Sequence, residues 1–585
     1  MYNADNMTFF ELTKYLEKLE KTSSRLEITQ ILADLFKKSK VDEIDRIVYL
    51  TLGSLAPNYR GMVFNIADKI MLQIIAKACG IDAGRVRESY KKEGDLGVVT
   101  EKLLESGKQK NFSSKITVGE IYEELFQIAQ DEGGGSVDRK IDQMARLLGK
   151  VDPLSARYLV RIPVGKLRLG FSDKTVIDAL SWMETGSKVK NKIISEAYNI
   201  LPDVGLLAKK VRREGIDKAC ENVLPIVGIP VLPMLAQRLK SPTEMIEKMG
   251  KVYVEPKFDG LRVLVHFQKS KDKSGHDLVK AFTRNSNDVT EMFPEILRVG
   301  EFINAGAVIL DSEAVGMDPQ MKLLADFQTT MKRRRVHQID LTAKEIPLRF
   351  QIFDVLYKDG ESLMDRPYKE RRNILEKLFN DNKLFVVDEK VETSDPEVIN
   401  EQYRKRIKEG LEGVIVKKID AKYVAGRTGW RWVKMKQEEQ SQGKLSDTVD
   451  AVVMGYTLGK GKRAGFGVGQ FLVGVVEPSG NIKTLTKIGT GLTDEQFKEL
   501  AKRLTKLKIG QKPKEYEAHK NYTPDFWVVP KLVVELAGDD LTKSPTHTSG
   551  YALRFPRLVN FRDDKSVSQA TTVGEVVKLF KLQRK

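Results

Sequence analysis

The feature that most constrains the fold is a change in hydrophobic periodicity near residue 225. Before it, apolar residues recur at helical spacing in stretches such as RLEITQILADLFKKS and DRKIDQMARLLGKV. A proline-rich segment, VLPIVGIPVLPMLAQRL, then disfavours a continuous helix. After about residue 250 the chain changes to short β-branched runs separated by turns, as in KVYVEPKFDGLRVLVHFQ. We therefore expect a domain boundary in the proline-rich segment.

Three domains follow from these patterns. Residues 1–225 are expected to form an all-α domain. Residues 226–440 are expected to be α+β, because helical stretches such as PEVINEQYRKRIKEG lie between the strand-like runs. Residues 441–585 begin with alternating apolar residues and glycine-containing turns, which favour a small β-barrel.

Composition narrows the class of protein. No stretch approaches the roughly 18 apolar residues of a membrane-spanning helix, and the N-terminus lacks a signal-peptide pattern, so we expect an intracellular protein. Two cysteines, Cys79 and Cys220, are too few for a disulfide framework or a four-cysteine zinc module. The net charge of +17 fits a polyanionic partner, nucleic acid first, and equally fits simple solubility.

The sharpest local feature is EPKFDGLR, residues 255–262. Lys257 follows the strand-like run VYVE, and Gly260 ends the tight turn before the next strand. A lysine amine attacks phosphorus only when neutral, so an attacking lysine needs burial or neighbouring cations and metal ions. Alone, this K-x-D-G pattern also fits a surface lysine beside a turn.

Further charged residues follow at strand ends. Glu313 lies in LDSEAV and Glu412 precedes the strand-like EGVIVK. Two carboxylates from separate strands suit a divalent cation on phosphate oxygens. Lys434 and Lys436, in WVKMK, share one face of a strand because side chains repeat every two residues, and an anion between them would relieve their repulsion.

Taken in order, K-x-D-G, S-E-A, F-x-x-F-D, E-G-V-I-V-K and W-V-K-M-K resemble the motif series of covalent nucleotidyltransferases. The flanking segments narrow the resemblance to ATP-dependent DNA ligases of the archaeal and eukaryotic replicative type. GIPVLPMLAQRL resembles their entry into the catalytic domain, and VRIPVGKLRLGFSDKTVIDAL resembles their helical DNA-binding domain. The segment from PDFWVVPKL to NFRDDKS resembles their C-terminal OB domain, so the likeness covers nearly the whole chain.

The resemblance implies a role for each matching residue around the nucleotide. Lys257 would be the nucleophile that takes AMP from ATP. Glu255 would accept a hydrogen bond from the adenine amino group, and Phe353 would stack on the base. Arg262 would contact the ribose and the nick, and Arg284 matches an arginine of the family's nucleotide pocket.

The resemblance also implies the phosphate and metal contacts. Glu313 and Glu412 would hold Mg²⁺. Lys417 and Lys434 would neutralise the α-phosphate, with Lys436 nearby. Cations of the last motif would orient the departing pyrophosphate when the OB domain closes: Arg554, Arg557, Arg562 and Lys565.

One position departs from the family pattern. The family usually has an arginine six residues before the first lysine of W-x-K-x-K, where this chain has Thr428. Arg427, one residue earlier, is our preferred substitute in the nucleotide pocket, and Arg431 is the alternative.

The implied activity is ATP-dependent sealing of nicks in duplex DNA, through an AMP-lysine intermediate and an adenylylated 5′-phosphate, in replication, repair and recombination. A capping-type guanylyltransferase shares the lysine chemistry but lacks the long helical front, and a non-catalytic DNA-binding scaffold would not need the intact motif residues.

We expect a monomer in the cytoplasm or nucleoid of a prokaryote. A sliding clamp is a further candidate partner, with FFELTKYL and QILADLF as weak candidate peptides. ADP or another nucleotide in place of ATP stays open.

Overall fold

The computed structural model describes residues 6–107, 112–167, 169–270, 275–334, 338–426, 429–436, 447–459, 466–538 and 540–583. By contacts the chain divides into two compact units. The first comprises residues 1–55, 63–189 and 439–585, and the second residues 56–62 and 190–438. This division into two units does not test the bounds of the three domains expected from the sequence, which stay predictions. No helix among the described residues is both long and apolar enough to cross a membrane.

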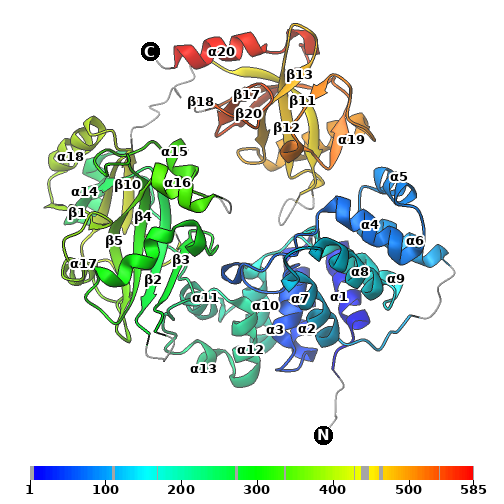
Figure 1. The fold of residues 1–585 in the computed structure, drawn as a ribbon, viewed down its shortest axis with the longest axis horizontal. Helices are drawn as coiled ribbons and strands as arrows, with labels where there is room; N and C mark the ends of the chain where they lie inside the picture. The colour runs from blue at the N-terminus through cyan, green and yellow to red at the C-terminus, as the bar shows by residue number, and fades with distance from the viewer. Residues whose placement is uncertain are drawn as a thin grey trace. The chain divides into compact units, whose positions relative to one another are not determined.

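The N-terminal part of the first unit is helical, as the periodicity predicts. In its first helix, Leu12, Leu16 and Leu19 are fully buried on one face, and Thr8 and Glu11 form a capping box at its start. The helices are α1 (Phe9–Lys21), α2 (Arg25–Lys38), α3 (Ile44–Thr51), α4 (Asp68–Cys79), α5 (Ala83–Glu93), α6 (Leu96–Ser106), α7 (Val118–Gln130), α8 (Ser136–Leu148), α9 (Pro153–Arg161) and α10 (Asp173–Thr185) (Figure 1).

The basic segment at the end of α9 is engaged inside this helical region. Arg161 is 5% exposed and pairs with Glu20 and Asp95, at 3.0 Å each. Arg157 pairs with Glu20 at 2.9 Å, and Lys166 pairs with Asp68 at 2.6 Å. These three charges neutralise carboxylates of the same region and are therefore not free to lie along a phosphate backbone. Arg168, from the same segment, lies outside the described residues.

The two weak candidates for a clamp-binding peptide are parts of α1 and α2. Phe9 and Leu12 in FFELTKYL, and Leu32 and Phe36 in QILADLF, are at most 1% exposed. Neither segment is therefore available as an extended peptide in this structure, and a sliding clamp stays a prediction without a located binding segment.

The second unit contains two sheets whose strands pair mainly in antiparallel fashion. One has the order β3-β2-β4-β5-β6, with β7 parallel to β5, and the other the order β10-β9-β1-β8. Their strands are β1 (Val252–Lys257), β2 (Leu261–Gln268), β3 (Leu278–Thr283), β4 (Ala307–Gly316), β5 (Leu348–Lys358), β6 (Glu361–Ser362), β7 (Phe385–Val387), β8 (Val391–Thr393), β9 (Gly413–Lys418) and β10 (Trp432–Lys436).

Helices cover these sheets, as expected for an α+β domain, and residues 222–240 contain none, as the prolines predict. Figure 1 shows α14 and α18 beside the sheet that holds β1 and β10. The helices of this unit are α11 (Asn191–Ile200), α12 (Val204–Glu214), α13 (Ile216–Cys220), α14 (Pro242–Met249), α15 (Phe327–Met331), α16 (Ile339–Glu345), α17 (Tyr368–Leu375) and α18 (Pro396–Lys408), with short 3₁₀ turns η1 (Asn58–Arg60), η2 (Thr290–Met292) and η3 (Pro294–Glu301).

Alternation along the strands decides which side chains face inward between the two sheets. In β1, Val252 and Val254 pack with Ile399 of α18 in one apolar cluster. Because side chains alternate along a strand, Glu255 and Lys257 project from the other face. The same rule sends Val416 of β9 toward α18 and Lys417 away from it. The two sheets therefore enclose charged residues between them.

The C-terminal part of the first unit is rich in strands, which curl in Figure 1, and its buried apolar residues form two clusters. Its central strand, β11, pairs with β12, β16 and β17. This arrangement is consistent with the predicted OB-type barrel. The elements are β11 (Val449–Thr457), β12 (Gln470–Val476), β13 (Ile482–Ile488), α19 (Asp494–Leu507), β14 (Lys508–Ile509), β15 (Tyr516–Glu517), η5 (Lys520–Tyr522), β16 (Phe526–Val528), β17 (Val533–Ala537), β18 (Asp540–Lys543), β19 (Tyr551–Arg554), β20 (Arg557–Phe561), η6 (Val567–Gln569) and α20 (Val573–Leu582).

Candidate active site

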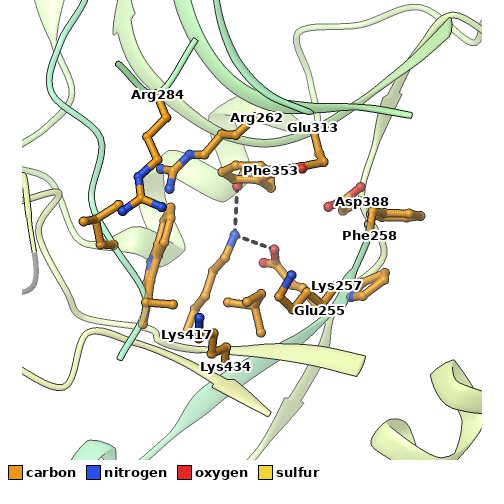
Figure 2. A pocket seen from close by; sticks show the side chains of 15 residues that line it. Glu255, Lys257, Phe258, Arg262, Arg284, Glu313, Phe353, Asp388, Lys417 and Lys434 are labelled. Atoms are coloured by element: carbon orange, nitrogen blue, oxygen red, sulfur yellow. Dashed lines mark hydrogen bonds and ion pairs between the residues drawn. The ribbon is translucent and has the colours of Figure 1, made fainter. Parts of the chain in front are cut away.

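A cavity of about 200 Å³ lies between the two sheets of the second unit. Figure 2 shows the side chains that line it. The six-stranded sheet and its loops supply the upper side in this view, and β1, β9 and β10 supply the lower side. Eight of the residues predicted from the sequence line this cavity: Glu255, Lys257, Arg262, Arg284, Glu313, Phe353, Lys417 and Lys434.

Lys257 is the last residue of β1, as its position after VYVE predicts. Its Nζ forms an ion pair with Oε2 of Glu412, and its carbonyl oxygen accepts a hydrogen bond from the backbone N–H of Glu412 at 3.1 Å. Gly260, in the turn after Lys257, has no room for a side chain, since a Cβ there would lie 2.5 Å from the carbonyl oxygen of Ala314. The tight turn thus fixes where the strand ends and where the lysine projects.

Glu412 joins two lysines at this end of the cavity. Its Oε1 lies 3.3 Å from Nζ of Lys436, while Oε2 pairs with Lys257. Burial alone would raise the pKa of Glu412, but the charges of these lysines outweigh it and hold the pKa below its usual value. The pKa of Lys434 is lowered by burial and by neighbouring cations, which include Lys257 and Lys436. An anion such as a phosphate would relieve that repulsion.

Glu255 is held by a buried network. It is 1% exposed, and its Oε2 accepts a hydrogen bond from Nζ of Lys417 at 2.6 Å. Its Oε1 accepts one from the hydroxyl of Tyr368 at 2.5 Å. Lys417 also lies 4.5 Å from the ring centre of Phe353, and Figure 2 shows it between that residue and Glu255. Burial lowers the pKa of Lys417 although Glu255 favours its charged form.

Tyr368 reaches Glu255 because α17 is fixed to β5. Arg371 of this helix makes two hydrogen bonds to Asp354, at 2.8 and 2.9 Å, and both side chains are fully buried. A bidentate arginine–carboxylate pair fixes orientation as well as distance. Tyr368, one turn earlier in the same helix, is thereby aimed at the cavity side of β1.

Arg262 is held in a similar way from β4. It donates to both oxygens of Asp311, at 2.9 and 2.6 Å, and to the carbonyl oxygen of Met234 at 2.6 Å. Tyr423 donates to Asp311 at 2.8 Å. Burial opposes the charge of Arg262, but Asp311 outweighs it and raises the pKa of the guanidinium above its usual value. Arg262 therefore enters the cavity as a fixed cation.

Glu313 is a cavity carboxylate whose negative charge is poorly compensated. Burial, reinforced by the charges of Asp311 and Glu412, raises its pKa to about 7, against the opposing effect of Lys257 and Arg262. Among the described residues, no group of three or more His, Cys, Asp or Glu side chains is placed to hold a metal ion. Glu313 and Glu412 nevertheless fit a shared divalent cation, because an added positive charge would favour the ionised form of Glu313.

The cations of the last motif lie in the other compact unit, so their place at the nucleotide stays a prediction. Arg562 donates to Asp564 at 2.7 Å and to Asp450 at 3.2 Å, and Lys565 donates to Asp450 at 2.5 Å. Arg554 ends β19, and Arg557 begins β20. Asp450 thus holds two of the four cations in one place.

The choice of a substitute for the missing arginine stays a prediction. Arg427 and Thr428 lie outside the described residues. Arg431 directly precedes β10, and its carbonyl oxygen accepts a hydrogen bond from the backbone N–H of Lys418 at 2.9 Å.

Comparison with known proteins identifies the family. Residues 8–181 match the model of the DNA ligase N terminus, residues 233–436 that of the ATP dependent DNA ligase domain, and residues 464–565 that of the ATP dependent DNA ligase C terminal region. A probable DNA ligase of Dictyoglomus thermophilum is 39% identical over 590 residues, which cover 99% of this chain and 98% of that protein. The chain belongs to the ATP-dependent DNA ligases.

Further relatives agree with this assignment. The DNA ligase of Sulfurisphaera tokodaii is 37% identical, over 99% of this chain and 98% of that protein. A solved structure named Pmar-Lig_PreS3 shares the fold with a TM-score of 0.52 at 18% identity, over 94% of this chain and 99% of that one. The resemblance in motif order is thus confirmed: the protein is a ligase enzyme, and neither the capping-type guanylyltransferase nor the non-catalytic scaffold is supported.

The structure also adds residues in and around the cavity that the sequence analysis missed. Tyr368, Asp311 and Tyr423 hold predicted residues in place, and Asp388 and Trp432 line the cavity of the ligase. Asp311 and Trp432 lie inside the motifs already recognised. Tyr368, Tyr423 and Asp388 carry no local signal, because their partners are far away in the chain.

Proposed function

We propose that Lys257 is the residue on which this ligase carries AMP. The neutral amine attacks the α-phosphorus of ATP, so that a P–N bond forms while the bond to the pyrophosphate oxygen breaks. An oxygen of the 5′-phosphate at a DNA nick then attacks the same phosphorus and releases the lysine. Finally the adjacent 3′-hydroxyl attacks the activated 5′-phosphate, the strand is joined and AMP leaves.

The observation that carries this proposal is the environment of Lys257. It ends β1 at a cavity that also presents the cations Arg262, Arg284 and Lys434. Glu412 accepts a hydrogen bond from its Nζ, which holds the amine at this end of the cavity. A half-buried amine held beside phosphate-binding cations supports nucleophilic attack on a nucleoside triphosphate.

Lys434, with Lys436 next to Glu412, supports binding of the α-phosphate, because their mutual repulsion falls when an anion lies between them. Glu313 and Glu412 would hold Mg²⁺, which would supply positive charge for the phosphate oxygens and the leaving pyrophosphate. Lys417 is assigned to the same phosphate by the family pattern. In this structure its Nζ pairs with Glu255, so that assignment requires a change of partner when ATP binds.

The remaining assignments are parts of the same proposal. Glu255 and Phe353 bind the adenine, and Arg554, Arg557, Arg562 and Lys565 orient the pyrophosphate. The helical region binds duplex DNA mainly through its phosphates, although Arg157, Arg161 and Lys166 are engaged with carboxylates and so other cations must serve. The ligase acts as a monomer on nicked DNA inside a prokaryotic cell. Clamp recruitment and the use of ADP follow only from family likeness.

The test is covalent labelling of the full-length protein. Incubation with ATP, ADP, GTP or NAD labelled in the α- or adenylyl phosphate, with Mg²⁺, should transfer label from ATP to the protein. Lys257→Ala should take no label, while Lys251→Ala, an exposed lysine just before the same strand, should label normally. A stable adduct on Lys257→Ala would refute the assignment, and labelling by GTP but not ATP would favour the guanylyltransferase instead.

A further inference from the structure

Asp388 is a buried carboxyl group that none of the motifs includes. It follows β7 and lines the cavity at 5% exposure. Its backbone N–H donates to the carbonyl oxygen of Ile352 at 3.0 Å, which places it beside Phe353. Its Oδ1 has no hydrogen-bond partner among the residues that the structure describes. A buried polar atom without a partner is costly, so its presence in a binding cavity points to a ligand.

Figure 2 shows Asp388 at the same end of the cavity as Glu255 and Phe258, away from Arg284. This is the end to which the proposed function assigns the adenine, through Glu255 and Phe353. Asp388 therefore lies where the edge of a nucleobase would lie.

The residue between Glu255 and Lys257 has no backbone N–H group that could donate a hydrogen bond to the base. That residue is Pro256, which lines the cavity and lacks an N–H group. Glu255 itself is an acceptor; the hydroxyl of Tyr368 holds it in place, and Lys417 pairs with it in the structure without nucleotide. Adenine presents both a donor, its 6-amino group, and an acceptor, its ring N1, on one edge. With that backbone donor absent, a side chain can supply the donor for N1.

Asp388 has the chemistry of that donor. Burial raises its pKa well above the usual value and the charge of Glu255 adds to this, while Lys417 and Arg372 oppose it. Two carboxyl groups in one buried site favour a state in which one keeps its proton. The pair then offers one anionic acceptor and one hydroxyl donor.

We propose that Asp388 selects the nucleobase: as a neutral acid it donates a hydrogen bond to N1 of adenine, while Glu255 accepts one from the 6-amino group. The inference rests on the proposed function, which places ATP in this cavity. It also explains discrimination against 6-oxo purines, whose N1–H would face the hydroxyl of Asp388 and whose O6 would face the carboxylate of Glu255.

Trp432 is the other cavity residue with a buried polar atom, its Nε1, that has no partner among the described residues. Its ring lies 5.4 Å from the guanidinium of Arg262 and 5.9 Å from the ring of Tyr423. Its ring also lies 5.8 Å from the ring of Phe353, so its Nε1 is a competing donor to the base. Trp432→Phe therefore serves as the matched control, because it removes the competing donor.

The experiment compares ATP with 1-deaza-ATP, which lacks only the ring N1, in the labelling of full-length enzyme. We expect kcat/KM for 1-deaza-ATP to be lower by about tenfold in the wild type, mainly through KM, as for one lost hydrogen bond in a buried site. Asp388→Asn keeps an N–H donor and should keep this difference, and so should Trp432→Phe. Asp388→Leu and Asp388→Ala should label equally with both nucleotides, and their preference for ATP over ITP should narrow.

A difference between ATP and 1-deaza-ATP that persists in Asp388→Leu and Asp388→Ala would overturn the inference. So would its loss in Trp432→Phe, which would move the donor to the indole. Purine riboside triphosphate lacks the 6-amino group that Glu255 binds, so it should remain a poor substrate of Asp388→Leu and Asp388→Ala. If the wild type took no label from ATP, the proposed function would fail. If ATP labelled Lys257 but N1 made no difference to any variant, the role of Asp388 alone would fail.

Discussion

Replacing Glu313 with Gln should stabilise the metal-free ligase at alkaline pH. Burial, with the charges of Asp311 and Glu412, raises the pKa of Glu313 to about 7 from an ordinary value of 4.5. In the absence of a divalent cation the folded protein must therefore carry a poorly compensated negative charge above neutral pH. The variant removes that charge and keeps the size of the side chain.

The sign follows from proton linkage. A carboxyl group with a raised pKa in the folded state binds its proton more tightly in the folded protein than in the unfolded chain. Its contribution to the free energy of unfolding is therefore fully present below pH 4.5 and is lost as the pH rises through 7. If the Glu313 side chain were fully enclosed, the loss of unfolding free energy would be roughly 3 kcal/mol. Glu313 lines a cavity that solvent enters, so we expect about 2 kcal/mol.

The assay is urea unfolding in EDTA, followed by tryptophan fluorescence, from about pH 4.5 to about pH 8.5. The advantage of Glu313→Gln over wild type should grow across this range and reach about 2 kcal/mol. Glu401→Gln, an exposed glutamate of α18 with the same charge change, should show no such trend. Parallel pH profiles for Glu313→Gln and wild type would refute the reasoning.

Three further predictions follow from contacts in the structure. Gly413→Ala should destabilise the protein by on the order of several kcal/mol in thermal unfolding, because φ is +148° and a Cβ would lie 2.2 Å from a carbonyl oxygen of β10. Gly410→Ala shares the strain of a positive φ, +81°, but has open space around it and should cost less. Asp311→Asn should slow labelling by ATP about a hundredfold, since Arg262 loses its bidentate partner, as single-turnover kinetics would measure. Arg562→Ala should slow labelling by ATP but spare the sealing of nicks that already carry AMP on the 5′-phosphate.

The sequence predicted the architecture well because periodicity is a local property. The helices up to residue 185, the strands around the K-x-D-G turn and the curled C-terminal sheet all follow from the spacing of apolar residues. The cavity could also be predicted in outline. Glu255 and Lys257 must share a face of β1 by alternation alone, and Lys434 and Lys436 must share one of β10.

What the sequence could not supply is the partner of each charge. The sequence identifies Arg161 only as a basic residue on a helix. The structure shows that Glu20, 141 positions away in the chain, neutralises it. No sequence motif includes Asp388, because its chemical role depends on Glu255, which reaches the same cavity from another sheet. Periodicity identifies the buried face of an element, whereas the contacts that turn a charge into an ion pair or a binding group are made across the fold.

The central claim is that AMP is carried on Lys257. The most direct measurement is peptide mapping by mass spectrometry of the full-length ligase after incubation with ATP and Mg²⁺, before and after addition of nicked duplex DNA. The account predicts an AMP adduct on the peptide that contains Lys257, and its disappearance as the nick is sealed. An adduct on any other residue, or one on Lys257 that nicked DNA leaves in place, would contradict it.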